Sequence, residues 1–303
     1  MTQTVLILGG TGRFGRHTTQ AFTKAGWCVR QFDRHRDNLH VAASSADVIV
    51  SAWNPPYPEW EKMTMALHRD VIDVAEKTGA TVILPGNVYV YGPNSGSLLA
   101  EGTQHHADNP LGRIRIEMER AYRDSNVRTI ILRAGDFIDT QASGNWFDKV
   151  MIKSLSKGKL TYPGAIDAPH AWAYLPDVAR AAVSLAECRH ELQRFEDVPY
   201  AGFTLTGNEL AHVLAQVLGR DVVAQRMNWL PLQLLTPFWD MARCLVEMRY
   251  LWTMPHQLDG SKFAQLVPDF KSTPVATALQ NATQEYQSTN SPDYILRSTQ
   301  TSR

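Results

Sequence analysis

Cysteine is scarce in this chain of 303 residues. Only Cys28, Cys188 and Cys244 occur, far apart and with no pair in a Cys-x-x-Cys spacing. This odd, scattered set argues against a disulfide framework and against a structural zinc site. The adjacent His105 and His106 invite a metal-binding interpretation, but neighbouring histidines in a loop rarely converge on one ion. We therefore expect free thiols and no metal centre.

A surplus of one charge and long apolar runs are also absent. Lys and Arg together number 30, as do Asp and Glu, so the formal net charge is zero and the basic footprint of a nucleic-acid binder is missing. No window approaches the roughly 20 apolar residues of a membrane span, and the N-terminus has no signal-peptide pattern. We expect no nucleic acid and no membrane as a partner, and a cytoplasmic location.

Short apolar runs alternate with helix-like segments over the first half of the chain. Such runs are typical of strands buried on both faces of a parallel sheet. The alternation predicts an α/β fold with a doubly wound parallel sheet. Strands are predicted at 5–8, 29–32, 48–52, 82–84 (ended by Pro85 and Gly86) and 127–132, and helices at 13–25, 59–78 and 112–124.

Segment 9–15, Gly-Gly-Thr-Gly-Arg-Phe-Gly, follows the first predicted strand and opens the first predicted helix. Glycines let the chain turn tightly and let a pyrophosphate approach the main chain. The helix N-terminus supplies free N–H groups and a positive dipole end. This arrangement predicts dinucleotide binding, with contacts from Gly9, Thr11, Gly12, Arg13, Phe14 and Gly15.

Asp33 ends the second predicted strand, 24 residues after Gly9, about where a ribose-binding acid belongs. Its carboxylate would accept hydrogen bonds from the 2′-hydroxyl of NAD and repel the 2′-phosphate of NADP. Arg34, Arg36 and Arg13 would do the reverse by pairing with that phosphate. We expect NAD or NADP as the cofactor, with a preference for NAD.

After about residue 140 the alternation loosens, and helices are predicted at 145–157, 176–187 and 207–218. We expect a Rossmann-type NAD(P)-binding domain over 1–144. Residues 145–285 would complete its core and form a small, mostly helical substrate lobe, and 286–303 would be a polar tail. The stretch 229–252, rich in Trp, Leu, Pro and Met, is either core, the lid of an apolar substrate pocket or the surface of a homodimer.

Four segments together resemble the short-chain dehydrogenase/reductase superfamily, in its atypical and extended branches of the NAD-dependent epimerase/dehydratase type. They are the glycine turn 9–15, Asn-Val-Tyr-Val-Tyr-Gly at 87–92, Leu-Arg-Ala-Gly-Asp-Phe at 132–137 and Ala-Trp-Ala-Tyr-Leu-Pro-Asp-Val-Ala at 171–179. The resemblance covers about residues 4–285. It implies the same fold, and a reaction in which hydride passes between a nicotinamide and a bound substrate.

The catalytic positions of that superfamily are occupied by other residues here. Where the resemblance implies a Ser, a Tyr and a Lys, this chain has Asn87, Leu111 and Arg115. Leucine cannot transfer a proton, and arginine titrates too high to act as a base. Only thirteen residues separate Asp33 from Asp47, too few for the usual helix, strand and helix, so we expect the sheet to lack one strand.

Residues after the other predicted strands are further candidates, since strand ends line the ligand crevice of open α/β sheets. Trp53, Asn54, Pro85 and Arg115 are expected to contact the cofactor. Substitutes for the missing catalytic residues are expected among Asn87, Tyr91, Asp136 and His170. If the stretch after the fourth strand is extended, Tyr89 and Tyr91 would lie on the same side.

We expect an NAD(P)-dependent oxidoreductase or epimerase/dehydratase-like enzyme that acts on an unidentified small carbonyl or hydroxyl substrate, for which a nucleotide-sugar-like compound is one candidate. The protein would contribute positioning and electrostatics. The alternative is a non-catalytic NAD(P)-binding redox sensor, which the loss of the usual catalytic residues favours.

Overall fold

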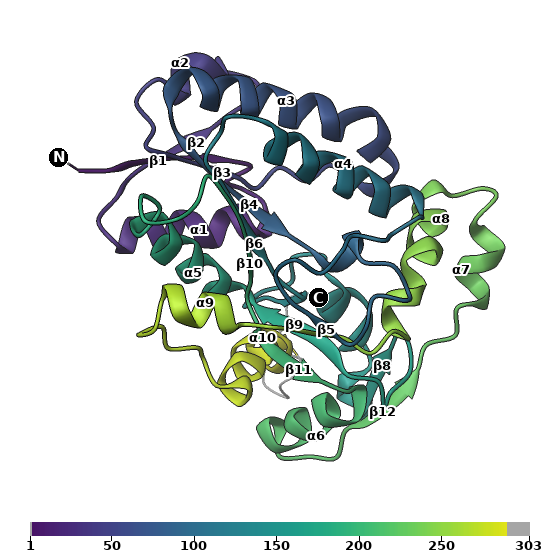
Figure 1. Cartoon of the computed structure of the whole chain (residues 1–303). Coiled ribbons are helices and arrows are strands. Elements are labelled where there is room, and N and C mark those ends of the chain that lie inside the picture. Colours follow the sequence, from purple (N-terminus) through teal and green to yellow (C-terminus); the bar gives the residue numbers. More distant parts are fainter. Residues whose placement is uncertain (1, 290–303) are drawn as a thin grey trace, which may run out of the picture.

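The computed structural model describes residues 2–289, and its centre is a six-stranded sheet in which every neighbouring pair is parallel. The strands lie in the order β10 (Phe195–Pro199), β6 (Thr129–Arg133), β4 (Thr81–Gly86), β3 (Val48–Ser51), β1 (Thr4–Leu8) and β2 (Cys28–Phe32) (Figure 1). The predicted doubly wound parallel sheet is confirmed.

Strand β4 is longer than predicted. It continues through Pro85 and Gly86, which pair with Leu132 and Arg133 of β6. A proline is tolerated there because the paired residues of β3 reach only to Ile83 of β4, so the missing N–H of Pro85 faces no partner strand.

The prediction that the sheet lacks one strand between Asp33 and Asp47 is confirmed. Between β2 and β3 the chain forms only the five-residue helix α2 (Leu39–Ala43). In the described part of the chain, β2 is therefore the edge of the sheet next to β1.

Helices cover both faces of this sheet. Helix α1 (Arg13–Lys24) and α5 (Leu175–Glu187) pack on one face, where Phe14 and Phe22 join the core. Helices α3 (Trp60–Thr78) and α4 (Pro110–Asp124) lie with α2 on the other, as Figure 1 shows. Strands β1, β3 and β6 are mainly apolar because both of their faces are buried.

The segments 136–174 and 203–289, which we call the second region, contain two small sheets that were not predicted from the sequence. Strand β9 (His170–Tyr174) lies between β7 (Asp136–Ile138) and β11 (Phe203–Leu205), and β8 (Lys159–Tyr162) pairs with β12 (Val223–Arg226). Helices predominate around them, as expected: α6 (Gly207–Leu218), α7 (Leu230–Leu235), α8 (Asp240–Glu247), α9 (Ser261–Leu266) and α10 (Val275–Thr289).

The helix predicted over 145–157 is wrong as a single element. The chain forms a π-helical turn, Phe147–Met151, and a separate 3-10 turn, Leu155–Lys157. The Ile152 N–H donates to the carbonyl of Phe147 five residues earlier, and such a wide turn does not propagate.

The remaining elements are short. They are the 3-10 turns Tyr57–Glu59, Val88–Val90 and Met248–Trp252, and the strands β5 (Leu98–Leu99) and β13 (Gln257–Leu258), which pair with each other. Helix α10 extends four residues into the predicted polar tail, whose residues 290–303 lie outside the described part. Among the helices described, none is both long and apolar enough to cross a membrane.

Candidate functional site

The glycine turn between β1 and α1 is held by main-chain contacts. Gly9 has φ +78°, and its carbonyl accepts a hydrogen bond of 2.9 Å from the Gly12 N–H. A Cβ on Gly15 would lie 2.1 Å from the Gly9 oxygen, so only glycine fits there. No side chain caps the first turn of α1, which leaves its N–H groups and the positive dipole end available to an anion.

The other residues of the turn separate into two groups. Thr11 and Gly12 are exposed at its tip, whereas Phe14 is buried in the core. Arg13 reaches toward the second region: its Nη2 lies 3.7 Å from the place that a Cβ on Gly144 would occupy, and Lys149 Nζ lies 3.5 Å from the same point. Two cations thus gather beside the turn, which suits a negatively charged ligand.

Asp33 lies beside the glycine turn at the carboxyl ends of the strands, because Leu8 of β1 and Phe32 of β2 are paired in register just before them. One carboxylate oxygen of Asp33 accepts the His35 N–H at 2.9 Å, and the Asp33 N–H donates to Asp37. These bonds hold a turn after β2 and leave the side chain half exposed. Arg34 is exposed beside it.

The other residues predicted to contact the cofactor lie at or near the carboxyl ends of β3 and β4. Trp53 packs edge-on against Phe32, with ring centroids 5.6 Å apart, and its Cδ1 lies 3.1 Å from the place of a Cβ on Gly9. Asn54 is exposed next to it. Arg115 is buried in α4 and donates to the Pro85 carbonyl at 2.9 Å.

Asp136 and His170, which lie 34 positions apart, form a hydrogen-bonded pair. They stand on the parallel strands β7 and β9, and His170 Nε2 lies 2.7 Å from Asp136 Oδ2. The His170 ring stacks on Trp252 with centroids 4.4 Å apart and planes 1° from parallel, and His256 lies edge-on to it at 4.5 Å. His170 is buried, but about a quarter of the Asp136 side chain is exposed, so the carboxylate is the accessible member.

A second hydrogen-bonded pair comes from the segments that follow β3 and β4 of the central sheet. The hydroxyls of Tyr57, after β3, and Tyr89, after β4, lie 2.5 Å apart. Burial raises the pKa of Tyr57 to about 12, the negative charge of Asp136 adds to this effect, and the positive charge of Arg13 opposes it. Burial and the Tyr57 hydroxyl raise the pKa of Tyr89 well above 10, and Asp136 again contributes. Both tyrosines therefore stay protonated and lie within the electrostatic reach of Asp136.

Sequence reasoning missed Tyr57. Its signal was its place three residues after Asn54, in the loop that was expected to line the crevice. Tyr57 also packs on Trp60 at 5.2 Å, and the Trp60 indole donates to the Pro55 carbonyl. This local packing fixes the loop and with it the tyrosine hydroxyl.

Two buried polar atoms near Asp136 have no hydrogen-bond partner among the described residues: the Tyr162 hydroxyl and His256 Nε2. Burial raises the pKa of Tyr162, and the charge of Asp136 adds to the effect. Burial lowers the pKa of His256 to about 4, and His170 contributes. Because unpartnered buried polar atoms are rare, they mark this region as one that can receive a hydrogen-bonding ligand.

The stretch after β4 is not extended, so the condition under which Tyr89 and Tyr91 would share a side is not met. Tyr89 lies within the 3-10 turn Val88–Val90 and Tyr91 follows it, and residues two apart in such a turn point in different directions. Tyr89 joins Tyr57, whereas Tyr91 is 1% exposed and packs under the Arg133 guanidinium at 5.5 Å. The Asn87 side chain caps the turn by accepting the Tyr89 N–H.

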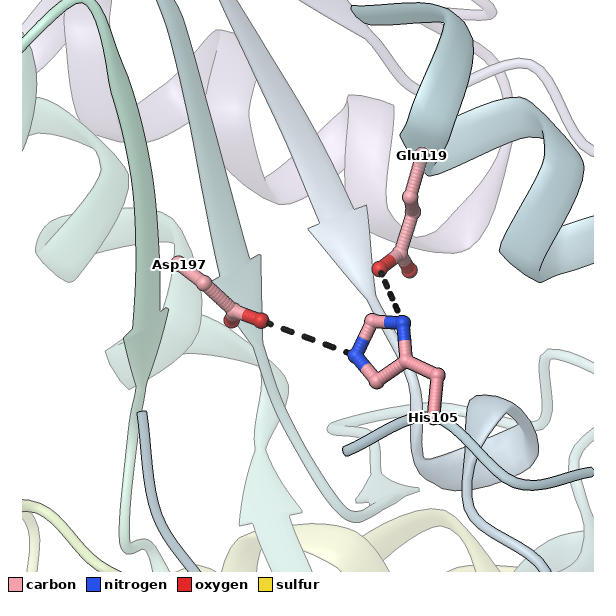
Figure 2. Close-up of side chains that lie close together, drawn as sticks. All are labelled: His105, Glu119 and Asp197. Carbon is pink, nitrogen blue, oxygen red and sulfur yellow. Dashed lines mark ion pairs between the residues drawn. The ribbon is translucent and has the colours of Figure 1, made fainter. Parts of the chain in front are cut away.

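Figure 2 shows His105 between the carboxylates of Glu119 and Asp197, each 4.0 Å from a ring nitrogen. The same oxygens, Glu119 Oε2 and Asp197 Oδ2, accept hydrogen bonds of 2.7 and 2.6 Å from the fully buried Arg133. A metal ion here would compete with the guanidinium for these atoms. The cluster is a buried ion-pair network that joins α4, β6 and β10.

Asp139 ties the start of α1 to the second region. Its carboxylate is hydrogen-bonded to His17 at 2.7 Å and accepts from Arg16 Nη2 at 3.1 and 2.9 Å. Burial opposes ionisation of Asp139, but the hydrogen bonds from His17 and Ser143 and the charge of Arg16 hold its pKa well below the usual range. The helix that follows the glycine turn is thereby fixed relative to β7.

No protein-family model matches the chain, and no curated protein matches it. Solved structures do match over nearly the whole length. A UDP-glucose-4-epimerase from Stenotrophomonas maltophila, with bound NAD and formylated UDP-arabinopyranose, is 14% identical with a TM-score of 0.72, over 94% of this chain and 98% of that one.

The chain has the fold of these epimerases. A human epimerase family protein solved with NADPH is 18% identical with a TM-score of 0.71, over 93% of this chain and 99% of that one. A UDP-glucuronic acid 4-epimerase from Bacillus cereus in complex with NAD is 13% identical with a TM-score of 0.69, over 94% and 98%. The resemblance to the epimerase/dehydratase branch is confirmed at the level of the fold.

Proposed function

We propose that this chain is an NAD(P)-dependent oxidoreductase or epimerase/dehydratase-like enzyme acting on a small hydroxyl or carbonyl compound of the nucleotide-sugar type. The observation that carries the proposal is the presence of two hydrogen-bonded pairs, Asp136–His170 and Tyr57–Tyr89, in which the Asp136 carboxylate is accessible and adds to the raised pKa of both tyrosines. The structural neighbours that hold NAD or NADPH and UDP-sugars support it.

The residues present fit a dinucleotide. The turn leaves no room for a side chain at Gly15, the first turn of α1 is uncapped, and Arg13 with Lys149 adds positive charge. Gly9, Thr11 and Gly12 would hold the pyrophosphate and Asp33 the adenine ribose, which favours NAD over NADP. Trp53, Asn54, Pro85 and Arg115 would form the wall beside it. When bound, the cofactor supplies the group that accepts or returns a hydride.

The protein's own part is proton handling and positioning. We assign Asp136 as the group that takes the proton from a substrate hydroxyl, because its carboxylate is the accessible member of the pair. His170 orients it through the 2.7 Å bond and is itself fixed by the stack on Trp252. Burial holds Tyr57 and Tyr89 protonated; one hydroxyl donates to the other, and the second hydroxyl of the pair donates a hydrogen bond to the substrate oxygen. In this assignment Tyr91 and Asn87 are structural.

The test begins with titrations of the purified chain with NAD, NADH, NADP and NADPH. Saturable binding, tighter for NAD than for NADP, is expected. A panel of UDP-sugars and simple carbonyls is then followed at the absorbance band of reduced nicotinamide, with product analysis for epimers. If no cofactor form binds, the proposal fails. Binding of both redox forms with no turnover of any compound would favour the redox-sensor alternative.

A further inference from the structure

Two buried polar atoms beside the Asp136–His170 pair limit which ligands this part of the molecule can take. Tyr162 and His256 are both 0% exposed. Among the described residues, neither the Tyr162 hydroxyl nor His256 Nε2 has a hydrogen-bond partner. A buried polar atom without a partner is unfavourable, so we expect both atoms to gain one when a ligand is bound.

The two rings that carry these atoms are fixed by their surroundings. Tyr162 ends strand β8, and its ring lies edge-on to Trp252 with centroids 5.8 Å apart. Gly207 leaves space for this ring, since a Cβ there would lie 2.9 Å from two of its atoms. The His256 ring lies edge-on to His170 at 4.5 Å. The polar atoms are therefore held in place, and the lack of a partner does not come from a loose side chain.

Ring contacts join both residues to Asp136. Trp252, on which Tyr162 packs, stacks on His170, and His170 is hydrogen-bonded to Asp136. Burial raises the pKa of Tyr162 and lowers that of His256, and the charge of Asp136 acts on both. The Asp136 side chain is about a quarter exposed, whereas Tyr162 and His256 are covered. A ligand would therefore enter beside Asp136 and reach the two atoms as the rings shift to receive it.

The hydrogen-bonding role of each atom follows from its contacts. His256 Nδ1 lies 2.9 Å from the Met254 carbonyl oxygen, which can only accept, so Nδ1 carries the hydrogen. Burial lowers the pKa of His256 to about 4, and His170 contributes, so the ring is neutral at pH 7 and Nε2 is an acceptor. Burial keeps the Tyr162 hydroxyl protonated, and it can donate. The ligand must therefore bring a donor for His256 and an acceptor for Tyr162.

A hydroxyl group meets both needs because it donates one hydrogen bond and accepts others. A carbonyl oxygen would pair with Tyr162 alone. A carboxylate has no hydrogen for His256 Nε2 and would be repelled by Asp136. We propose that Tyr162 and His256 bind hydroxyl groups of a neutral sugar, next to the hydroxyl that faces Asp136, and that they select against carboxylated sugars. This inference rests on the proposed function, in which Asp136 faces the substrate.

The first test needs no ligand and compares Tyr162→Phe with Tyr122→Phe. Tyr122 is also 0% exposed, but its hydroxyl is hydrogen-bonded to His68 at 2.9 Å. We expect Tyr122→Phe to lower the melting temperature by about 2 °C or more, because it removes a hydrogen bond. Tyr162→Phe should leave the melting temperature unchanged or raise it. An equal fall in both variants would show that the Tyr162 hydroxyl is already paired in the free protein, by an ordered water for example, and would overturn the proposal.

The second test is calorimetric titration of the full chain with UDP-glucose, UDP-glucuronic acid and UDP. The two sugars differ only at C6, where a carboxylate replaces the hydroxymethyl group. We expect the wild-type chain to bind UDP-glucose at least tenfold more tightly than UDP-glucuronic acid. Tyr162→Phe should weaken the binding of UDP-glucose at least tenfold, and so should His256→Asn, whose amide can still donate to the Met254 carbonyl. Neither change should alter the affinity for UDP or NAD.

The same titrations separate this inference from the proposed function. If the wild-type chain does not bind NAD, the proposed function fails. If it binds NAD but both variants bind UDP-glucose as tightly as the wild type, this inference alone fails. It also fails if the wild-type chain binds neither sugar, or binds UDP-glucuronic acid as tightly as UDP-glucose.

Discussion

The glycine turn and the Asp136–His170 pair belong to one proposed site but are built in different ways. The turn is made by main-chain atoms of seven consecutive residues, and its function depends on what is absent, a side chain at Gly15. The pair depends on two side chains from separate strands and on Trp252 from a third segment. The cofactor half is therefore determined by local geometry, whereas the substrate half is determined by which side chains the fold brings together.

If this contrast is right, changing the side-chain pair should remove chemistry and leave cofactor binding intact. On the proposed function, Asp136→Asn keeps the shape but cannot accept a proton, and kcat should fall by roughly 100-fold or more. His170→Gln should lower kcat less and shift its pH profile, because His170 acts through Asp136. Steady-state kinetics and cofactor titration measure both. The control is His212→Gln, on the exposed face of α6. A matching loss of cofactor affinity would break the contrast.

The converse change belongs in the turn. Gly15→Ala would place a methyl group 2.1 Å from the Gly9 oxygen, so the loop must move. We expect cofactor binding to weaken by about 100-fold, which corresponds to about 2.7 kcal/mol. Calorimetric titration measures it, with circular dichroism to monitor folding. Gly219→Ala is the control: that glycine has positive φ (+63°) but nothing within 4 Å of the added Cβ, so only a small loss of stability and no loss of cofactor affinity are expected. Wild-type affinity in Gly15→Ala would show that the turn does not hold the ligand.

The contact of Asp139 with His17 and Arg16, which joins the end of β7 to α1, should make the free energy of unfolding depend on pH in the acid range. Asp139→Asn removes the charge that His17 and Arg16 bind, at a cost of roughly 2 kcal/mol in the free energy of unfolding at pH 7. The folded-state pKa of Asp139 lies below the unfolded value, so its stabilisation is complete above about pH 4 and is lost as the pH falls through the folded pKa. Urea unfolding of both proteins from pH 7 downward measures this. The difference should narrow below pH 4; a constant difference would assign the effect to packing.

The central sheet could be predicted because its signals are local. An apolar run such as Val48–Ser51 can only be a buried strand in this context, and thirteen residues after Asp33 leave no room for another strand. The glycine turn is likewise contained in seven residues. The resemblance in four ordered segments then fixed the fold, which the solved structures match.

The second half of the site was harder because it depends on contacts between distant residues. The sequence indicates Asp136 and His170 as separate candidates, and only the pairing of β7 with β9 brings them together. Tyr57 was missed since its partner Tyr89 follows a different strand. Asn87 caps the 3-10 turn Val88–Val90, and this turn directs Tyr91 away from Tyr89. Such a local turn is not described by the alternation of side chains along a strand.

The missing strand has a consequence for solubility. With β2 at the edge of the sheet, a row of main-chain N–H and C=O groups is open to pairing with another molecule. Arg30 stands in the middle of that strand, and its guanidinium is held by the Ser45 hydroxyl at 2.7 Å. A charge held at this position disfavours pairing of β2 with the edge strand of another molecule.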